Sequence, residues 1–319
     1  MEHYPERKIR LKEHQRGQRW EATVSEYQRS LADATLGPGP FVMEVDSDGF
    51  VSSAFEKSDD LGDIIVLGDS IPENTFVPAE KRLCRMIELA LREQGHRVRV
   101  LNGGVSGASS LHTLNVIASK VLALKPKLIL VMNGTIDTEC AIETSSFWTK
   151  HEYFDPFTYG YVDVDHPYIE ERQSPDFEDR KRILRSMVYL ANQFGIPVAF
   201  STSHHRLRDG DELMQRIYSD ERYAERLSRW KGTHKATRDV CSELRVPLLD
   251  VHKKFSGRSD LLYDDIHMNE HGAREVGRWM AGELGAIFER SAKKTRGAAP
   301  IERMRNLVRT FARAALPGR

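Results

Sequence analysis

The stretch of sequence that decides the fold is DIIVLGDS, residues 63–70. Its first five residues form a short apolar run that is typical of a buried strand, and Gly68-Asp69-Ser70 ends that run with a turn. Apolar residues then recur at helical spacing over Pro78–Gln94, and RVRVL at Arg97–Leu101 predicts a second strand. A strand, a helix and another strand in this order indicate a parallel sheet with right-handed connections.

The same alternation of short apolar runs and helical patterns continues along the chain. Further strands are predicted at Lys127–Met132, Ile196–Ser201 and Val246–Val251, and further helices at Leu111–Leu124, Asp176–Phe194, Asp220–Leu244 and Glu270–Arg290. Five buried parallel strands with helices on both faces define an α/β fold.

Length and composition narrow the class of protein. A chain of 319 residues fits one large or two small domains. Lys and Arg together number 47 and so do Asp and Glu, which argues against a surface built for nucleic acid. We find no apolar run long enough to span a membrane and no signal-peptide core. Three widely spaced cysteines form neither a zinc motif nor a disulfide framework, so we expect a cytoplasmic protein.

The two ends differ in composition from the body of the chain. Residues 1–40 predict a charged helical extension that ends at a Gly-Pro-Gly-Pro break, and residues 41–290 form the main domain. Residues 291–319 carry eight basic residues and one acid, a net charge of +7, with apolar residues at mostly helical spacing. This pattern predicts a basic amphipathic helix that docks on the body, contacts a second subunit or contacts an anionic membrane surface.

An aromatic-rich insert interrupts the strand–helix rhythm at residues 147–175. Eight aromatic residues occur between Phe147 and Tyr168, among them Trp148 and Tyr153. A long loop of this kind is either a surface segment with its own hydrophobic cluster or a wall of the functional site. On the second interpretation, Trp148 and Tyr153 are candidate substrate-binding residues.

Residues with acyl-transfer chemistry follow the predicted strands. Ligands bind outside the carboxyl ends of strands in open α/β sheets. Ser70 follows the first strand, a glycine-rich turn over 102–107 follows the second, and Asp264 and His267 come shortly after the fifth. A serine nucleophile needs a histidine base, and the histidine needs an acid that fixes its tautomer. Asp264 and His267, three residues apart, project from the same side if the turn is helical.

Each of these motifs has an ordinary structural explanation when taken alone. Gly-Asp-Ser is commonly a plain turn, Asp-x-x-His can begin a helix, and a glycine turn can cradle a phosphate. The order of the motifs and their places at strand ends favour an acyl-transfer site. The pair His204-His205 suggests a metal, but adjacent side chains on an extended chain point to opposite sides. We therefore predict no metal site there.

In these motifs the chain resembles the SGNH, or GDSL-type, hydrolase family. The resemblance rests on Val66–Ser70, on Asn102–Gly107, on Gly134–Asp137 and on Asp264–His267 followed by Asn269 and Gly272. It implies a flavodoxin-like three-layer sandwich with a five-stranded parallel sheet. It also implies Ser70 as nucleophile, His267 as base and Asp264 as its orienting acid, with the amides of Ser70 and Gly107 in the oxyanion hole. Family members act on small-molecule acyl esters without a metal or another cofactor.

The third motif departs from the family pattern. Ile136 stands where the family usually has an asparagine whose side chain donates to the oxyanion. Loss of one such donor costs about 10²–10³ in rate. Asn133, three residues earlier, is a candidate replacement in the oxyanion hole. Asp69 and Asp137, which belong to the first and third motifs, are further candidate substrate-binding residues.

Three functions remain open on these residues. The first is a serine esterase or deacylase that hydrolyses a carboxylic ester through Ser70, His267 and Asp264. The second is an acyltransferase with the same triad, in which an alcohol replaces water. The third is a non-catalytic binding module on the same fold, a possibility raised by Ile136.

Overall fold

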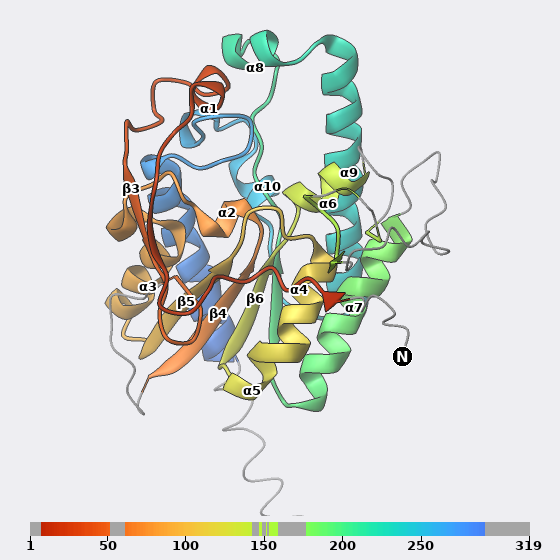
Figure 1. Ribbon diagram of the computed structural model, residues 1–319. Helices are drawn as coiled ribbons and strands as arrows, with labels where there is room; N and C mark the ends of the chain where they lie inside the picture. The colour runs from red at the N-terminus through yellow and green to blue at the C-terminus, as the bar shows by residue number, and fades with distance from the viewer. Residues whose placement is uncertain are drawn as a thin grey trace, which may run out of the picture.

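The computed structural model describes residues 8–51, 61–141, 147–148, 151, 153–158 and 177–290. At its centre lies a five-stranded parallel sheet with the strand order β5-β4-β6-β8-β9 (Figure 1). The strands are β4 (Gly62–Gly68), β5 (Val98–Gly104), β6 (Leu128–Met132), β8 (Val198–Ser201) and β9 (Leu248–Leu249). This topology confirms the predicted α/β fold with a five-stranded parallel sheet.

Helices cover both faces of the sheet and complete three layers (Figure 1). One face carries α3 (Leu83–Glu93), α10 (Val251–Phe255) and the helix over 270–290, and the other carries α4 (Ser110–Val116), α5 (Leu122–Leu124), α7 (Phe177–Gln193) and α9 (Asp220–Leu244). A π-helical turn, Ile117–Val121, joins α4 to α5. Among the described helices, none combines the length and the apolar composition that a bilayer-spanning segment requires.

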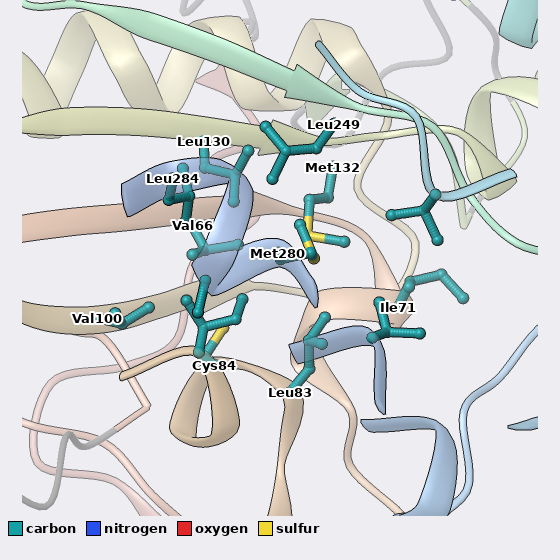
Figure 2. Packing of buried hydrophobic residues seen from close by; sticks show 14 of the residues in the cluster. Val66, Ile71, Leu83, Cys84, Val100, Leu130, Met132, Leu249, Met280 and Leu284 are labelled. Atoms are coloured by element: carbon teal, nitrogen blue, oxygen red, sulfur yellow. The ribbon is translucent and has the colours of Figure 1, made fainter. Parts of the chain in front are cut away.

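Successive side chains along the central strands belong to two hydrophobic cores, one on each face of the sheet. Ile64 and Val66 of β4 belong to one core, and Ile65 and Leu67 belong to the other, because successive side chains of a strand point to opposite faces. Figure 2 shows the first core, where Val66 lies among side chains from neighbouring strands, from α3 and from the helix over 270–290. Full burial of each such side chain contributes about 1.5–3 kcal/mol, so the position of β4 is strongly determined.

The strand order places a crevice at the end of β4. The chain runs from β4 to β5 on one side and then crosses to β6 on the other side of β4. The loops that follow these strands therefore separate at the carboxyl end of β4, which is where ligands bind in this class of sheet. The segments after β4, β5 and β6 carry three of the four motifs.

The helix expected over residues 1–40 is wrong for the described part of that segment. Strand β2 (Arg19–Ala22) pairs antiparallel with β3 (Phe41–Glu44), and the helical part is α1 (Glu26–Ser30), which a Ser25 capping box begins. Exposed and half-buried side chains alternate along β2, which is a strand pattern. Nearer the N-terminus, β1 (Lys8–Ile9) pairs with β7 (Phe157–Thr158). The tail 291–319 and most of the insert 147–175 lie outside the described residues.

Candidate active site

Ser70 opens a short helix directly at the end of β4. This helix, α2 (Ser70–Glu73), is capped by Asp69, whose Oδ1 accepts a hydrogen bond from the backbone N–H of Ile71 at 3.0 Å. The close approach of α2 to β5 needs Gly104, because a Cβ there would lie 2.4 Å from the backbone nitrogen of Glu73. The serine hydroxyl is thereby held at the mouth of the crevice.

The carboxylate of Asp69 stabilises this turn through hydrogen bonds to backbone N–H groups. Its Oδ2 accepts hydrogen bonds from three successive backbone N–H groups, those of Gly134, Thr135 and Ile136, at 3.1–3.3 Å. The residue is fully buried. The substrate-binding role expected for Asp69 is therefore wrong, since the carboxylate instead joins the loops after β4 and β6.

The loop between residues 262 and 269 brings the remaining triad candidates to Ser70. The Nε2 atom of His267 lies 2.7 Å from the Oγ of Ser70, and its Nδ1 lies 2.7 Å from Oδ2 of Asp264. The other carboxylate oxygen of Asp264 accepts the backbone N–H groups of Ile266 and His267 at 2.9 and 2.6 Å. These bonds form a compact turn, and the helix begins only at residue 270.

The charge of Asp264 controls the protonation of His267. Burial alone would lower the pKa of His267, but the negative charge of Asp264 and its hydrogen bond to the ring raise that pKa to about 9. Asp265 and Asp69 add smaller contributions in the same direction. At neutral pH the ring is therefore mostly protonated, and the neutral form that can accept the proton of Ser70 increases as the pH rises.

Gly107 lies at the crevice in a conformation that favours glycine. Its φ is +80°, and an added Cβ would lie 2.7 Å from Cε1 of Tyr153 and 2.8 Å from Nζ of Lys12. The preceding residue, Ser106, donates its backbone N–H at 2.9 Å and its hydroxyl to the buried carboxylate of Glu73. The turn is fixed, so the N–H of Gly107 has a defined direction.

The segment after β6 contains Ile136, which stands at the position of the asparagine usual in the third motif, and Asn133, the candidate replacement. Asn133 is buried and donates its side-chain N–H to the carbonyl of Ala108 at 3.0 Å, away from the cavity. The oxyanion role expected for Asn133 is therefore wrong. Ile136 lines the cavity and packs against Phe154. Thr135 also lines the cavity, and its buried Oγ1 has no hydrogen-bond partner among the described residues.

A cavity of about 390 Å³ lies around Ser70, His267 and Gly107. Most of the surface of its wall is apolar, and Tyr153 of the insert contributes to it. The other residues of the wall are Gln28, Leu31, Thr75, Phe76, Ser106, Thr135, Ile136, Glu139, Phe154, Tyr263, Asp264, Asp265 and Ile266. No sequence signal predicted that Gln28 and Leu31 of the N-terminal segment line the cavity. Long-range contacts bring this segment there, among them the hydrogen bond from the backbone N–H of Asp33 to the carbonyl of Tyr263 at 2.6 Å.

Two other residues that were predicted to bind substrate are not among the residues of this cavity wall. Asp137 is buried in an ion pair with Arg180, and it accepts the backbone N–H of Ser110 at 2.7 Å. Trp148 packs against the core on the side of α7. The described residues that line the cavity include neither of them, so this cavity gives no support to the substrate-binding roles expected for Asp137 and Trp148. Both side chains satisfy packing or charge inside the protein instead.

Comparison with known families assigns this arrangement to a class of enzymes. The profile of the GDSL-like lipase/acylhydrolase family matches residues 66–275. The chain therefore belongs to that family, whose members are ester-hydrolysing enzymes, and it is an enzyme of this kind. A comparison with curated protein sequences found no match.

Solved structures share the fold. The lipase/acylhydrolase from Enterococcus faecalis is 17% identical, with a TM-score of 0.51 over 71% of this chain and 97% of its own. An enzyme from the metagenome of Lake Arreo is 17% identical, with a TM-score of 0.49 over 70% and 95%. A catalytic mutant of an acetylxylan esterase from Geobacillus stearothermophilus is 16% identical, with a TM-score of 0.49 over 72% and 97%.

Proposed function

We propose that this protein is a serine esterase that removes the acyl group from a small-molecule ester, with Ser70 as nucleophile, His267 as base and Asp264 as orienting acid. One observation carries the proposal: an unbroken chain of hydrogen bonds, each of 2.7 Å between side chains, runs from Ser70 through His267 to Asp264. This is the arrangement in which a hydroxyl gains nucleophilicity from a neighbouring base. It favours a catalytic role over a non-catalytic binding module.

In the proposed reaction, the neutral Nε2 of His267 takes the proton from Oγ of Ser70 as the oxygen attacks the ester carbonyl. The protonated ring then gives that proton to the departing alcohol, and an acyl group remains on Ser70. Water, activated by the same ring, releases the acid and restores the serine. Asp264 keeps the proton on Nδ1 throughout, so that Nε2 faces the serine.

The developing oxyanion needs donors that point at the carbonyl oxygen. We assign this role to the backbone N–H groups of Ser70 and Gly107 and to the hydroxyl of Thr135. Support comes from the unpartnered Oγ1 of Thr135 in the cavity wall, because a buried hydroxyl without a partner is unfavourable until a ligand accepts its hydrogen bond. Thr135 would then supply the donor that Ile136 cannot.

The cavity wall indicates the kind of substrate. Most of its surface is apolar. Of its three carboxylates, Glu139 and Asp265 pair with Arg226, and Asp264 pairs with His267. The described residues of the wall include no Lys or Arg, and the adjacent Lys12 lies over the ring of Tyr153 and donates to the carbonyl of Ser106. We therefore propose an uncharged acyl group that a cavity of about 390 Å³ can accommodate.

Labelling and turnover together test this proposal. A fluorophosphonate probe should react with the wild-type protein, which should also hydrolyse p-nitrophenyl acetate. Ser70→Ala should abolish labelling and reduce turnover by several orders of magnitude, by analogy with other triads. Ser119→Ala is the matched control, because Ser119 is exposed on the surface, and it should leave both signals unchanged. Normal labelling of folded Ser70→Ala protein would refute the assignment.

Product analysis separates hydrolysis from acyl transfer. The same acyl-enzyme would pass its acyl group to an alcohol if the acceptor site excluded water. Release of free acid in the presence of excess acceptor alcohol supports the esterase, whereas formation of a new ester at the expense of free acid would make the protein an acyltransferase.

A further inference from the structure

Three histidines from distant parts of the sequence gather beside β8 and β9. His205 follows β8, His234 lies in the middle of α9, and His252 is the second residue of α10. One ring nitrogen of each lies within 4.8 Å of the others. The rings of His205 and His252 stack with centroids 4.7 Å apart, and those of His234 and His252 lie 4.4 Å apart.

Most ring nitrogens of this histidine cluster have no hydrogen-bond partner within the described part of the chain. Both nitrogens of His205, both of His234 and Nδ1 of His252 are buried without a hydrogen-bond partner among the described residues. The neighbouring His204 differs, because its Nε2 lies 3.0 Å from the carbonyl of Arg258. Five unpartnered nitrogens at one place are unusual, since buried polar atoms in native proteins are nearly always satisfied.

The protonation of these rings suits a metal. His205 and His234 are buried, and burial disfavours a charged ring. Neutral imidazole with a free lone pair is the form that binds transition metals. The nearby cation Arg238 is neutralised by Asp250 through an ion pair of 2.8 Å, which reduces its repulsion of a bound cation.

We propose that His205, His234 and His252 form a binding site for Zn²⁺ or another imidazole-preferring divalent metal, with water as the fourth ligand. Tetrahedral zinc has Zn–N distances of about 2.0–2.1 Å, which requires ligand nitrogens about 3.4 Å apart. To reach that spacing the three rings would have to rotate out of the stacked arrangement, in which His205 also stacks on Trp230. A donor set made of imidazole alone fits zinc and not the oxygen-seeking Ca²⁺ or Mg²⁺.

This metal would act as a structural clamp next to the catalytic loop. It would join the segment after β8 to α9 and α10. The residue after His205, Arg206, donates its backbone N–H to the carbonyl of Asp265 at 2.7 Å and its guanidinium to the carbonyl of Leu262 at 3.3 Å. The clamp would thus steady the loop that carries Asp264 and His267. The proposal of a metal site itself is independent of the proposed esterase activity.

The test uses the untagged full-length chain, stripped of metal with a chelator and titrated with Zn²⁺ or Co²⁺. We expect one metal per chain by elemental analysis and, with Co²⁺, the visible absorption of a four-coordinate site. His234→Leu and His252→Leu should each weaken binding at least about tenfold. His271→Leu is the control, because His271 is a partly exposed histidine of the helix over 270–290, outside the cluster, and it should bind like wild type.

Two results would overturn the metal site. The first is a folded wild-type protein that binds no metal at micromolar Zn²⁺, which would leave water as the partner of the rings. The second is binding that survives His234→Leu but is lost in His271→Leu, which would place the metal on the surface. If the leucine variants do not fold, zinc-edge X-ray absorption of the wild-type protein decides: about three imidazole ligands support the site, and fewer than two refute it.

Discussion

The charge of Asp264 is the perturbation whose effect the structure predicts most sharply. Asp264→Asn keeps the size of the side chain but removes the charge that raises the pKa of His267 to about 9. That displacement from the ordinary 6.5 corresponds to about 3 kcal/mol, because each pKa unit is worth about 1.4 kcal/mol. Burial remains in the variant and lowers the pKa, so the pKa of His267 should fall to 6.5 or below.

The pH dependence of kcat/KM reports this change. For the wild type we expect kcat/KM to rise with pH through a midpoint near 9, as the ring of His267 loses its proton. For Asp264→Asn the midpoint should move down by two pH units or more. The plateau should also fall about 10³–10⁴-fold, because the amide permits the wrong tautomer of the ring.

A neighbouring acid provides the matched control. Asp265 makes a smaller contribution to the pKa of His267, and its carboxylate accepts a hydrogen bond from the hydroxyl of Tyr218 at 2.7 Å. Asp265→Asn should therefore move the midpoint less than Asp264→Asn does. An unchanged midpoint in Asp264→Asn, with chemistry shown to limit the rate, would refute the reasoning, and so would a larger shift in Asp265→Asn.

The same titration affects the free energy of unfolding. A histidine whose pKa is higher in the folded than in the unfolded protein stabilises the fold fully below its unfolded pKa of about 6.5. This contribution of about 3 kcal/mol is lost as the pH rises through 9. In urea unfolding, the wild type should therefore lose more stability between pH 6 and pH 9.5 than Asp264→Asn does.

Three other changes test the remaining parts of the site. Thr135→Val should reduce kcat about 10²-fold if its hydroxyl is an oxyanion donor, whereas Thr135→Ser should retain most activity; equal rates in both would refute the role. Gly107→Ala should destabilise the protein more than Gly210→Ala, because both have positive φ but only the first new Cβ would meet Tyr153. Deletion after Gly297 should leave turnover of a small ester unchanged, and any binding of the intact chain to anionic vesicles should weaken with salt; a change of oligomeric state or loss of folding would favour docking.

Local patterns were sufficient to predict the elements around the sheet. The helix Asp220–Leu244 was expected with the same bounds that α9 has, since Ser219 caps its first turn and Arg245 ends it in a left-handed conformation. The N-terminal segment was mispredicted because a contact with a distant part of the chain, and not a local pattern, decides its structure. What decides its structure is pairing with β3 (Phe41–Glu44), which lies about twenty residues away, and local helical propensity does not report such contacts.

The site was predictable where a motif fixes geometry and unpredictable where distant residues decide. Asp264 and His267 are close in sequence, so their spacing indicates their contact. Asp137 is buried by Arg180, which lies more than forty residues further along, and nothing near Asp137 predicts that partner. The three histidines beside β8 are separated by tens of residues on three elements, which is why their spacing resembles no metal motif.

Asp69, Asp137 and Asp264 all follow strands or strand-end loops, and what each oxygen faces separates their roles. Asp69 is fully buried and accepts hydrogen bonds from four backbone N–H groups, so its carboxylate joins the loops after β4 and β6. Asp137 pairs with the buried guanidinium of Arg180, away from the cavity. Only Asp264, of these three, accepts a hydrogen bond from the ring that contacts Ser70, the ring of His267. This direct contact supports the orienting role that we propose for Asp264.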